Sequence, residues 1–343
     1  MSLPPCGGGS GWGVDIRYLI SSQGSDIEPT SETIAHWLAA GKQGFWLGIV
    51  DPDADDFDLL EHTFKFHPLT IDDIRHQNQR PKLEEYPGYF FVVLFSADLA
   101  GGHRVELQEH HLFLSPQYVV TVHVGTSDPL KRLHERITSS PEITHGKTAY
   151  LFYLVVDQLV DAMFPVLDEL DDATDEVEDR IIQRPDTATL SELSDLKRAV
   201  VDLRKVLGAQ RDVFQRLTTS AISDPTGTAA ADFPGEMSIY YRDVYDHLVR
   251  QYEIVDSLRD LLSTAMDVYL STVSNRLNLR ITRLTVFATL FLPLTFLTGF
   301  FGMNFAFLVS HIQPTWTFWV LAVGVMAAVT VGQLWYYRRL GWI

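Results

Sequence analysis

An uncharged stretch near the carboxyl end constrains this chain more than any other feature of its sequence. Residues 284–301 contain no charged side chain. A helix over this stretch, rising about 1.5 Å per residue, is long enough to cross the ~30 Å hydrocarbon core of a bilayer. A second uncharged run, residues 318–337, follows after a short loop. The two runs predict a hairpin of two transmembrane helices whose outer ends lie on the same side of the membrane.

Basic residues at the outer ends of this hairpin predict its orientation. Five arginines flank the two runs: Arg276, Arg280, Arg283, Arg338 and Arg339. The connecting loop, residues 302–317, contains no charged side chain. Positively charged residues stay on the cytoplasmic side of a membrane. We therefore expect both termini, including a basic tail at residues 338–343, in the cytoplasm, and the loop on the outer side of the plasma (inner) membrane.

Small and polar side chains follow one face of the first predicted transmembrane helix. Steps of three and four residues define a stripe: Asn278, Ile281, Thr285, Ala288, Leu292, Thr295, Gly299 and Gly302. Heptad spacing keeps one helix face turned towards a partner, and small side chains permit close packing in a membrane. Several copies around one axis would instead form a pore with hydroxyl and amide rings and a leucine constriction. The stripe alone is compatible with two interpretations, a packed helix dimer and a pore.

The charge balance of the remaining chain excludes one class of partner. Residues 1–283 hold all 44 acidic residues and 25 of the 27 basic ones, so that they carry 19 net negative charges. Nucleic acid is not an expected partner, because binding phosphates needs positive charge. An acidic body attached to a membrane hairpin suits the attraction of cations, although acidity for solubility is the commoner explanation. The single cysteine, Cys6, excludes an internal disulfide and fits a reducing compartment.

The amino-terminal part predicts a cytosolic α+β domain over residues 14–145, after a disordered lead-in at residues 1–13 that does not resemble a signal peptide. Segments rich in β-branched and aromatic residues predict five strands: 14–20, 45–50, 89–99, 105–115 and 118–124. Helical spacing predicts a helix over 55–66, which His67 and Pro68 interrupt before a short helix resumes. Together these elements predict a small mixed sheet layered with helices.

From about residue 146 the pattern becomes helical. Two amphipathic helices, at 157–183 and 189–217, predict an antiparallel hairpin within residues 146–235. The next segment begins near Ser238 and contains no helix breaker before Pro293, which a membrane helix tolerates. We therefore expect one helix from Ser238 to about Phe301, with a stalk at 236–283 and a transmembrane part at 284–301.

Several segments resemble the CorA-type divalent-metal transporter family. They are residues 67–86 (HPLTIDDIRHQNQRPKLEEY), 240–249 (YYRDVYDHLV), 267–278 (DVYLSTVSNRLN), 289–305 (TLFLPLTFLTGFFGMNF) and the terminal RRLGWI. The motif at the centre of the resemblance is Gly302-Met303-Asn304, which follows the first membrane span. A three-residue string is weak by itself, but here it ends the first of two carboxy-terminal spans and the preceding residues also match. The resemblance covers nearly the whole chain from Asp15 onwards.

This resemblance implies a homopentamer with a funnel-shaped cytosolic domain and a pore lined by the first membrane helix. The family transports Mg²⁺ and often Co²⁺ or Ni²⁺, and sister branches carry Zn²⁺. The stripe then becomes the pore face, with oxygen rings at Asn278, Thr285 and Thr295 and constrictions at Ile281, Leu284 and Leu292. By resemblance Asn304 is the selectivity residue, and backbone carbonyls of Gly302 add acceptors. Mg²⁺ gives up its waters reluctantly, so neutral oxygens suit the hydrated ion. The plainer alternatives are helix packing for the apolar positions and a chain-turning role for Asn304.

Regulation is expected on the cytosolic side. Asp267 matches the acidic residue that binds a regulatory divalent ion between neighbouring subunits of the family. Asp98 is the expected partner across that interface, and Asp243 matches a second acidic position. Facing carboxylates repel one another unless a cation bridges them, so high Mg²⁺ would hold subunits in a closed state. The alternative is that these three are solvated surface acids.

The sequence departs from the family in the outer loop. Many relatives carry an acidic residue there, whereas residues 306–316 contain none and His311 is the only titratable group. A histidine could favour softer metals such as Zn²⁺, but a lone loop histidine is usually a polar surface residue. The pair His110 and His111 alternates sides of a predicted strand, so we expect structural roles for both.

Other functional classes are weighed against transport. The sequence contains no phosphate-binding loop, nucleophile elbow or HExxH motif, so an enzyme is not expected. A membrane-anchored metal sensor and a Zn²⁺ carrier, with or without proton coupling, remain open alternatives. The polar stripe favours transport over a plain anchor, because an anchor gains nothing from threonine at bilayer depth.

Overall fold

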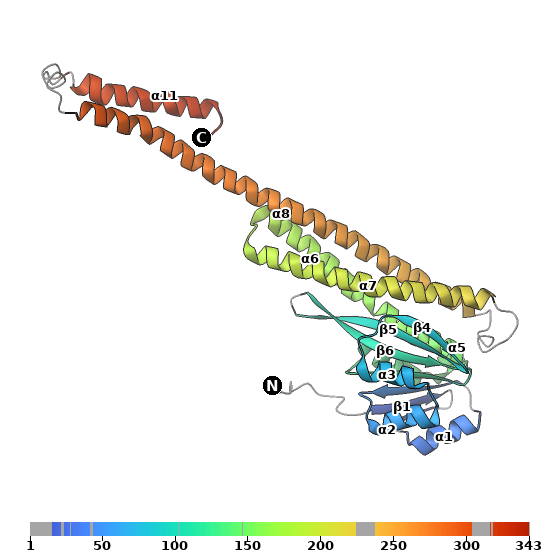
Figure 1. Cartoon of the computed structure of the whole chain (residues 1–343). Helices are drawn as coiled ribbons and strands as arrows, with labels where there is room; N and C mark the ends of the chain where they lie inside the picture. The colour runs from blue at the N-terminus through green and yellow to red at the C-terminus, as the bar shows by residue number, and fades with distance from the viewer. Residues whose placement is uncertain are drawn as a thin grey trace. The chain divides into compact units, whose positions relative to one another are not determined.

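The computed structural model describes most of the chain as two compact units. The described residues are 16–21, 24–27, 29–41, 44–101, 103–145, 147–223, 237–303, 316 and 318–342. The first unit comprises the chain up to Arg180 together with Asp186–Ala265, and the second comprises Ile181–Pro185 with Met266–Ile343. The predicted lead-in at residues 1–13 lies outside the described residues. Figure 1 shows the elements of both units along the chain.

A seven-stranded sheet forms the centre of the first unit, counted over the described residues. Its strands are β1 (Ile16–Ser21), β2 (Gly24–Ile27), β3 (Phe45–Val50), β4 (Lys82–Tyr86), β5 (Tyr89–Ala100), β6 (Arg104–Leu114) and β7 (Tyr118–His123). They lie in the order β2-β1-β3-β7-β6-β5-β4. Strands β3 and β7 are parallel, and every other neighbouring pair is antiparallel. The mixed sheet is therefore confirmed. The expectation of five strands was too low, because it missed the short edge strands β2 and β4.

Short helices cover one face of this sheet. They are α1 (Ser31–Ala39), α2 (Ala54–Asp58), the π-helix η1 (Leu59–Thr63) and α3 (Pro68–His76). Trp37 of α1 meets Phe45 of β3 edge to face at 5.7 Å between ring centroids. Phe66, just after η1, stacks on Phe113 of β6 at 3.8 Å. The helix predicted at 55–66 is observed as one continuous helical stretch over residues 54–63, which changes from α to π geometry at Leu59. The predicted break at His67-Pro68 precedes α3.

Two further helices, α4 (Asp128–Ser139) and α5 (Thr148–Asp161), cover the opposite face, and a 3₁₀ turn (Pro141–Thr144) joins them. Trp46 follows Phe45 in β3 and therefore points to the other side of the sheet. There it meets Tyr18 at 5.1 Å, and Tyr18 meets His134 of α4 at 4.8 Å. The hydroxyl of Thr148 accepts a hydrogen bond from the amide of Gly44, which fixes the start of α5 beside β3.

Three long helices follow: α6 (Met163–Gln183), α7 (Thr187–Ser223) and α8 (Ser238–Phe301). The sequence predicted one helix over 157–183, but the chain breaks at Ala162 between α5 and α6. Pro165 offers no N–H to the carbonyl of Asp161, four residues earlier, which weakens the helix at this point. Within the first unit, Arg204 of α7 forms an ion pair with Asp256 of α8 at 2.8 Å, so these two helices lie side by side there.

The single helix predicted from Ser238 to Phe301 is confirmed as α8, with Pro293 inside it. In the second unit α8 is followed by the π-helix η4 (Phe318–Gly324) and α11 (Val325–Arg339). Two helical segments are long and apolar enough to cross a membrane by length and composition, Thr148–Gln183 and Ser238–Phe301. The most apolar window of the first is 56% buried, whereas that of α8 is only 6% buried. Of these two segments, α8 is therefore the one whose most apolar window is left largely uncovered by the described residues.

Candidate pore face and metal cluster

In the second unit, α11 covers one face of the apolar part of α8 (Figure 1). Gln333 of α11 donates its side-chain amide to the carbonyl of Thr289 at 3.0 Å. Val286 of α8 and Tyr337 of α11 are each only 8% exposed. Partly buried residues of α8 mark the same face: Thr289, Leu290, Pro293, Leu294 and Leu297.

The predicted stripe lies on the opposite face and is uncovered. All eight of its residues are exposed in the single chain, with Leu292 at 72% and Ile281 at 59%. At about 100° per residue, the centre of the stripe lies roughly 150° around the helix axis from the face that α11 covers. Leu284, beside the stripe, is 70% exposed. The fold of one chain thus provides no partner for this surface among the described residues.

Exposure alone does not distinguish the stripe from a lipid-facing surface. Phe287, Phe291 and Phe296 are exposed to a similar degree, at 64%, 60% and 68%, and they flank the stripe on both sides. The chemical difference decides the interpretation. Large aromatic side chains suit contact with lipid, whereas small and hydroxyl side chains suit a helix interface or a wet path.

The hydroxyls on the stripe are oriented by their own helix. Thr285 donates to the carbonyl of Ile281 and Thr295 donates to the carbonyl of Phe291, each at 2.9 Å. A hydroxyl has one proton to donate and two lone pairs that can accept. Because the proton is used within the helix, the oxygen offers only acceptor positions to its surroundings. Both threonines therefore present neutral oxygen acceptors, the groups that a hydrated cation can use.

The end of α8 carries two residues of the predicted selectivity motif. The amide of Gly302 bonds to the carbonyl of Thr298 at 2.9 Å, and the amide of Met303 bonds to that of Phe300 at 3.3 Å. A Cβ atom at Gly302 would lie only 3.0 Å from the Thr298 carbonyl, so a larger residue would crowd this last turn. Asn304, the third residue of the motif, and His311 lie outside the described residues.

The three predicted regulatory acids are all exposed, and they are divided between the two units. Asp98 lies in β5, two residues before that strand ends, and its carboxylate accepts a hydrogen bond from the amide of Leu99 at 2.8 Å. It lines a groove of 980 Å³ in the first unit. Asp243 accepts a hydrogen bond from the Tyr153 hydroxyl at 3.4 Å, also in the first unit. Asp267 lies on α8 in the second unit.

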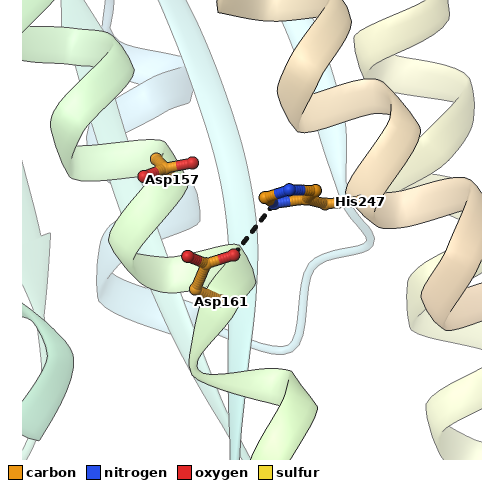
Figure 2. A group of neighbouring side chains, drawn as sticks. All are labelled: Asp157, Asp161 and His247. Atoms are coloured by element: carbon orange, nitrogen blue, oxygen red, sulfur yellow. Dashed lines mark ion pairs between the residues drawn. The ribbon is translucent and has the colours of Figure 1, made fainter.

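A group that the sequence reading missed lies close to Asp243. Asp157 and Asp161 of α5 meet His247 of α8, and one ligand atom from each lies within 4.8 Å of the others. Figure 2 shows the two carboxylates facing the imidazole, with an ion pair of 2.9 Å between Asp161 Oδ1 and His247 Nδ1. Two carboxylates and an imidazole are a ligand set that divalent transition metals accept, and carboxylates also suit Mg²⁺.

The electrostatics of this cluster favour a cation. Burial, together with the neighbouring charges of Asp161 and Asp243, raises the pKa of Asp157 to about 6, against opposing effects of His247 and Arg136. A bound cation would relieve this repulsion. The sequence signal was present in the four-residue spacing of Asp157 with Asp161 and of Asp243 with His247, which places each pair on one helix face. That α5 and α8 meet was not readable from the sequence.

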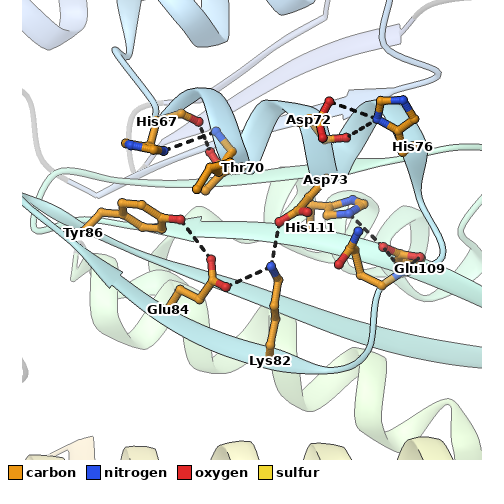
Figure 3. Close-up of polar contacts among 12 residues, drawn as sticks. His67, Thr70, Asp72, Asp73, His76, Lys82, Glu84, Tyr86, Glu109 and His111 are labelled. Atoms are coloured by element: carbon orange, nitrogen blue, oxygen red, sulfur yellow. Dashed lines mark hydrogen bonds and ion pairs between the residues drawn. The ribbon is translucent and has the colours of Figure 1, made fainter.

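The paired histidines of β6 lie on opposite faces of the sheet, as their alternation predicted. His110 Nε2 lies 2.9 Å from the hydroxyl of Ser96. His111 Nε2 forms an ion pair with Glu109 at 2.9 Å on the other face. Figure 3 shows this second face, where Lys82 also bridges Asp73 of α3 at 2.6 Å and Glu84 at 3.0 Å. These contacts tie α3 to the β4–β6 edge of the sheet and do not join the two histidines in one site.

Comparison with known proteins identifies the family. Residues 41–339 match the family model described as CorA-like Mg2+ transporter protein. The chain is 35% identical over 283 residues to the cobalt/magnesium transport protein CorA of Thermotoga maritima, covering 82% of this chain and 78% of that protein. It is 33% identical over 300 residues to the putative metal ion transporter YfjQ of Bacillus subtilis, covering 87% and 89%.

A solved structure shows the same fold over nearly the whole chain. The complete structure of the CorA magnesium transporter from Methanocaldococcus jannaschii superimposes with a TM-score of 0.79 at 20% identity, covering 97% of this chain and 100% of that one. Its match includes the α+β part, the long helix and the carboxy-terminal helices. The family consists of membrane transporters and not of enzymes. The chain therefore belongs to the CorA-like Mg²⁺ transporter family.

Proposed function

We propose that this protein conducts divalent cations, Mg²⁺ first and Co²⁺ or Ni²⁺ as further substrates, through a pore on the axis of a homopentamer. The observation that supports this most directly is the stripe on α8, which is polar and small, exposed, and turned away from α11. Five copies of that face around an axis would line a narrow wet path. The relatives named as Mg²⁺ and cobalt/magnesium transporters support the choice of ion.

Each part of the stripe has a role in this path. Acceptor oxygens of Asn278, Thr285 and Thr295 would bind the water shell of a passing ion, because Mg²⁺ keeps its waters. Apolar rings at Ile281, Leu284 and Leu292 would close the path by dewetting. The small residues Ala288 and Gly299 keep it wide between these rings. At the outer mouth, Gly302, Met303 and Asn304 form the selectivity filter, with the Asn304 amide oxygens as the ring that meets the hydrated ion.

The membrane topology belongs to the same proposal. Residues 284–301 and 318–337 cross the plasma (inner) membrane, both termini lie in the cytoplasm, and residues 302–317 form the outer loop. Arginines at the inner ends of the two spans support this orientation through the positive-inside rule.

Regulation by internal divalent ions is assigned to the first unit and the stalk. Asp98, Asp243 and Asp267 would bind Mg²⁺ between subunits and hold them in a closed arrangement. The cluster of Asp157, Asp161 and His247 adds a ligand set beside Asp243. We propose that it belongs to the same sensor.

The proposal is tested by divalent flux into proteoliposomes that contain Mg²⁺-sensitive, Zn²⁺-sensitive and pH-sensitive dyes in parallel. Wild type and Asn304→Ala are compared, and Asn275→Ala, a substitution of the same kind on the stalk, serves as the matched control. Mg²⁺ entry without a pH change, altered by Asn304→Ala and unaffected by Asn275→Ala, is the expected result.

The other outcomes identify the competing functions. Zn²⁺ entry accompanied by a proton signal would replace the Mg²⁺ channel with a proton-coupled Zn²⁺ carrier. Absence of flux for every ion, from protein that is folded and pentameric, would favour a membrane-anchored metal sensor.

A further inference from the structure

A proline interrupts the backbone hydrogen bonding of α8 in the middle of its apolar part. Pro293 has no N–H, so the carbonyl four residues earlier, that of Thr289, loses its helical donor. In a bilayer no water replaces the missing donor, and a carbonyl left without a hydrogen bond there is strongly unfavourable. Such a carbonyl must find a donor within the protein.

The structure supplies that donor from α11. The side-chain amide nitrogen of Gln333 lies 3.0 Å from the carbonyl oxygen of Thr289. The Thr289 hydroxyl does not take this role, because it bonds to the carbonyl of Thr285 at 2.8 Å and also lies 3.2 Å from that of Val286. Gln333 is therefore placed at the one carbonyl of α8 that Pro293 leaves free.

The side-chain amide of Gln333 also carries an energetic cost. Its oxygen, Oε1, is buried and has no hydrogen-bond partner among the described residues. An apolar side chain of similar size would avoid burying that oxygen, so packing alone does not account for a glutamine. The bond to Thr289 does account for it.

We propose that Gln333 is a positioning residue that ties α11 to the proline hinge of α8 and so controls how the hinge bends. This inference rests on the proposed function, because the hinge adjoins Leu292 of the pore face. Bending at Pro293 would move Leu292 away from the axis, and the Gln333 bond makes α11 follow that movement. Without this hydrogen bond, α8 could bend at Pro293 while α11 stays in place.

The test is a double-mutant cycle in full-length protein in lipid vesicles. Gln333→Met removes the donor while keeping an unbranched side chain. Pro293→Ala restores a backbone N–H, so that the Thr289 carbonyl no longer needs Gln333. The four proteins are compared by Mg²⁺ flux at high internal Mg²⁺ and by thermal unfolding.

Gln333→Met alone is expected to raise the residual flux and lower the folding equilibrium constant by about three- to twentyfold, the range measured for hydrogen bonds between membrane helices. In the Pro293→Ala background the same substitution should change neither quantity by more than about twofold. Gln333→Asn, whose amide is one methylene shorter, should behave like Gln333→Met. Thr330→Val is the matched control, because the Thr330 hydroxyl bonds to Met326 of its own helix at 2.8 Å.

Two results would overturn the inference. One is an equal effect of Gln333→Met with and without Pro293, and the other is wild-type behaviour of Gln333→Asn. Failure of the proposed function is recognised separately, because wild type would then carry no ion while the unfolding cycle still reports whether Gln333 and Pro293 are coupled.

Discussion

At the scale of single residues, burial determines the protonation state of two histidines in the first unit. His110 and His123 face each other across β6 and β7 with ring centroids 5.3 Å apart. Burial lowers the pKa of His123 to about 4 and that of His110 well below its usual value. Both rings are therefore neutral in the folded protein at pH 7, which suits a structural role in the sheet.

Acidification should destabilise the first unit through these histidines. A histidine of the unfolded chain binds a proton near pH 6.5, whereas His123 in the fold does so only near pH 4. The stability contributed by His123 is thus complete above about pH 6.5 and lost as the pH falls towards 4, by ~3 kcal/mol at most. Hydrogen exchange of β6 and β7 between pH 7 and 4.5 measures this loss.

The control for this acid effect is an exposed histidine. His123→Gln should flatten the pH dependence of the protection factors in β6 and β7, whereas His62→Gln, on the surface, should leave it unchanged. Equal slopes for His123→Gln and wild type would contradict the assignment.

Asp157 should make the stability of the fold depend on pH in the opposite direction. Its folded pKa of about 6 lies above the unfolded value, so without a bound cation the fold loses stability as the pH rises through about 6. Asp157→Asn should therefore stabilise metal-free protein at pH 8, by ~1 kcal/mol after allowance for partial exposure of the side chain. At pH 5, which lies between the unfolded and folded pKa values, the same substitution should stabilise the metal-free protein by only about half as much.

Mg²⁺ should reverse the effect of this substitution, because a cation needs the charged carboxylate. Thermal unfolding with EDTA and with Mg²⁺, at both pH values, makes the comparison, with Asp172→Asn on the exposed face of α6 as the charge control. Stabilisation by Asp157→Asn that persists unchanged in Mg²⁺ would exclude Asp157 from the metal site.

At the scale of elements, α8 combines two surfaces along one helix. Its first part buries residues at three- and four-residue spacing, among them Tyr241, Leu248, Val255 and Leu262. Gln251 belongs to the same buried face and donates to the carbonyl of Val160 at 2.7 Å, just before α5 ends. In the apolar part the same kind of spacing gives the uncovered stripe. The helix therefore packs on its own chain at one end and leaves one face uncovered by the described residues at the other.

The stripe predicts different outcomes for adjacent residues of α8. Leu292→Ala should increase Mg²⁺ leak several-fold at high internal Mg²⁺, because a smaller ring weakens a dewetted constriction. Phe291→Ala removes a larger side chain of similar exposure that lies off the stripe, and should leave the leak unchanged. Dye-based flux in proteoliposomes compares the two, and equal effects would mean that the stripe does not face the pore.

At the scale of the whole molecule, we expect the acidic surface and the proposed metal sites to make stability depend on the Mg²⁺ concentration. Carboxylates from several positions repel one another until a cation binds. The purified full-length protein should therefore resist protease better in Mg²⁺ than in EDTA. Asp243→Ala and Asp267→Ala should each weaken that protection, whereas Asp172→Asn should not. Protection that survives both alanine substitutions would place the sensor elsewhere.

The sequence by itself determined the order and approximate length of the main helices and strands of this protein. An uninterrupted helical pattern gave α8 from Ser238 to Phe301, and five apolar segments gave five of the strands of the mixed sheet. These elements were predictable because hydrophobic periodicity is local and repeats over many residues. The short strands β2 and β4 could not be predicted in this way, because their residues are largely polar. They are strands because each forms backbone hydrogen bonds with a neighbouring strand.

Only the tertiary structure decided which polar groups meet. The contact of Asp157 and Asp161 with His247 joins residues about ninety positions apart, and the bond from Gln333 to Thr289 joins α11 to α8. No periodicity predicts such pairs, because the docking of two helices is set by the packing of whole faces. A proline at position 293 leaves the Thr289 carbonyl without its helical donor, and only the fold showed which side chain supplies a donor instead.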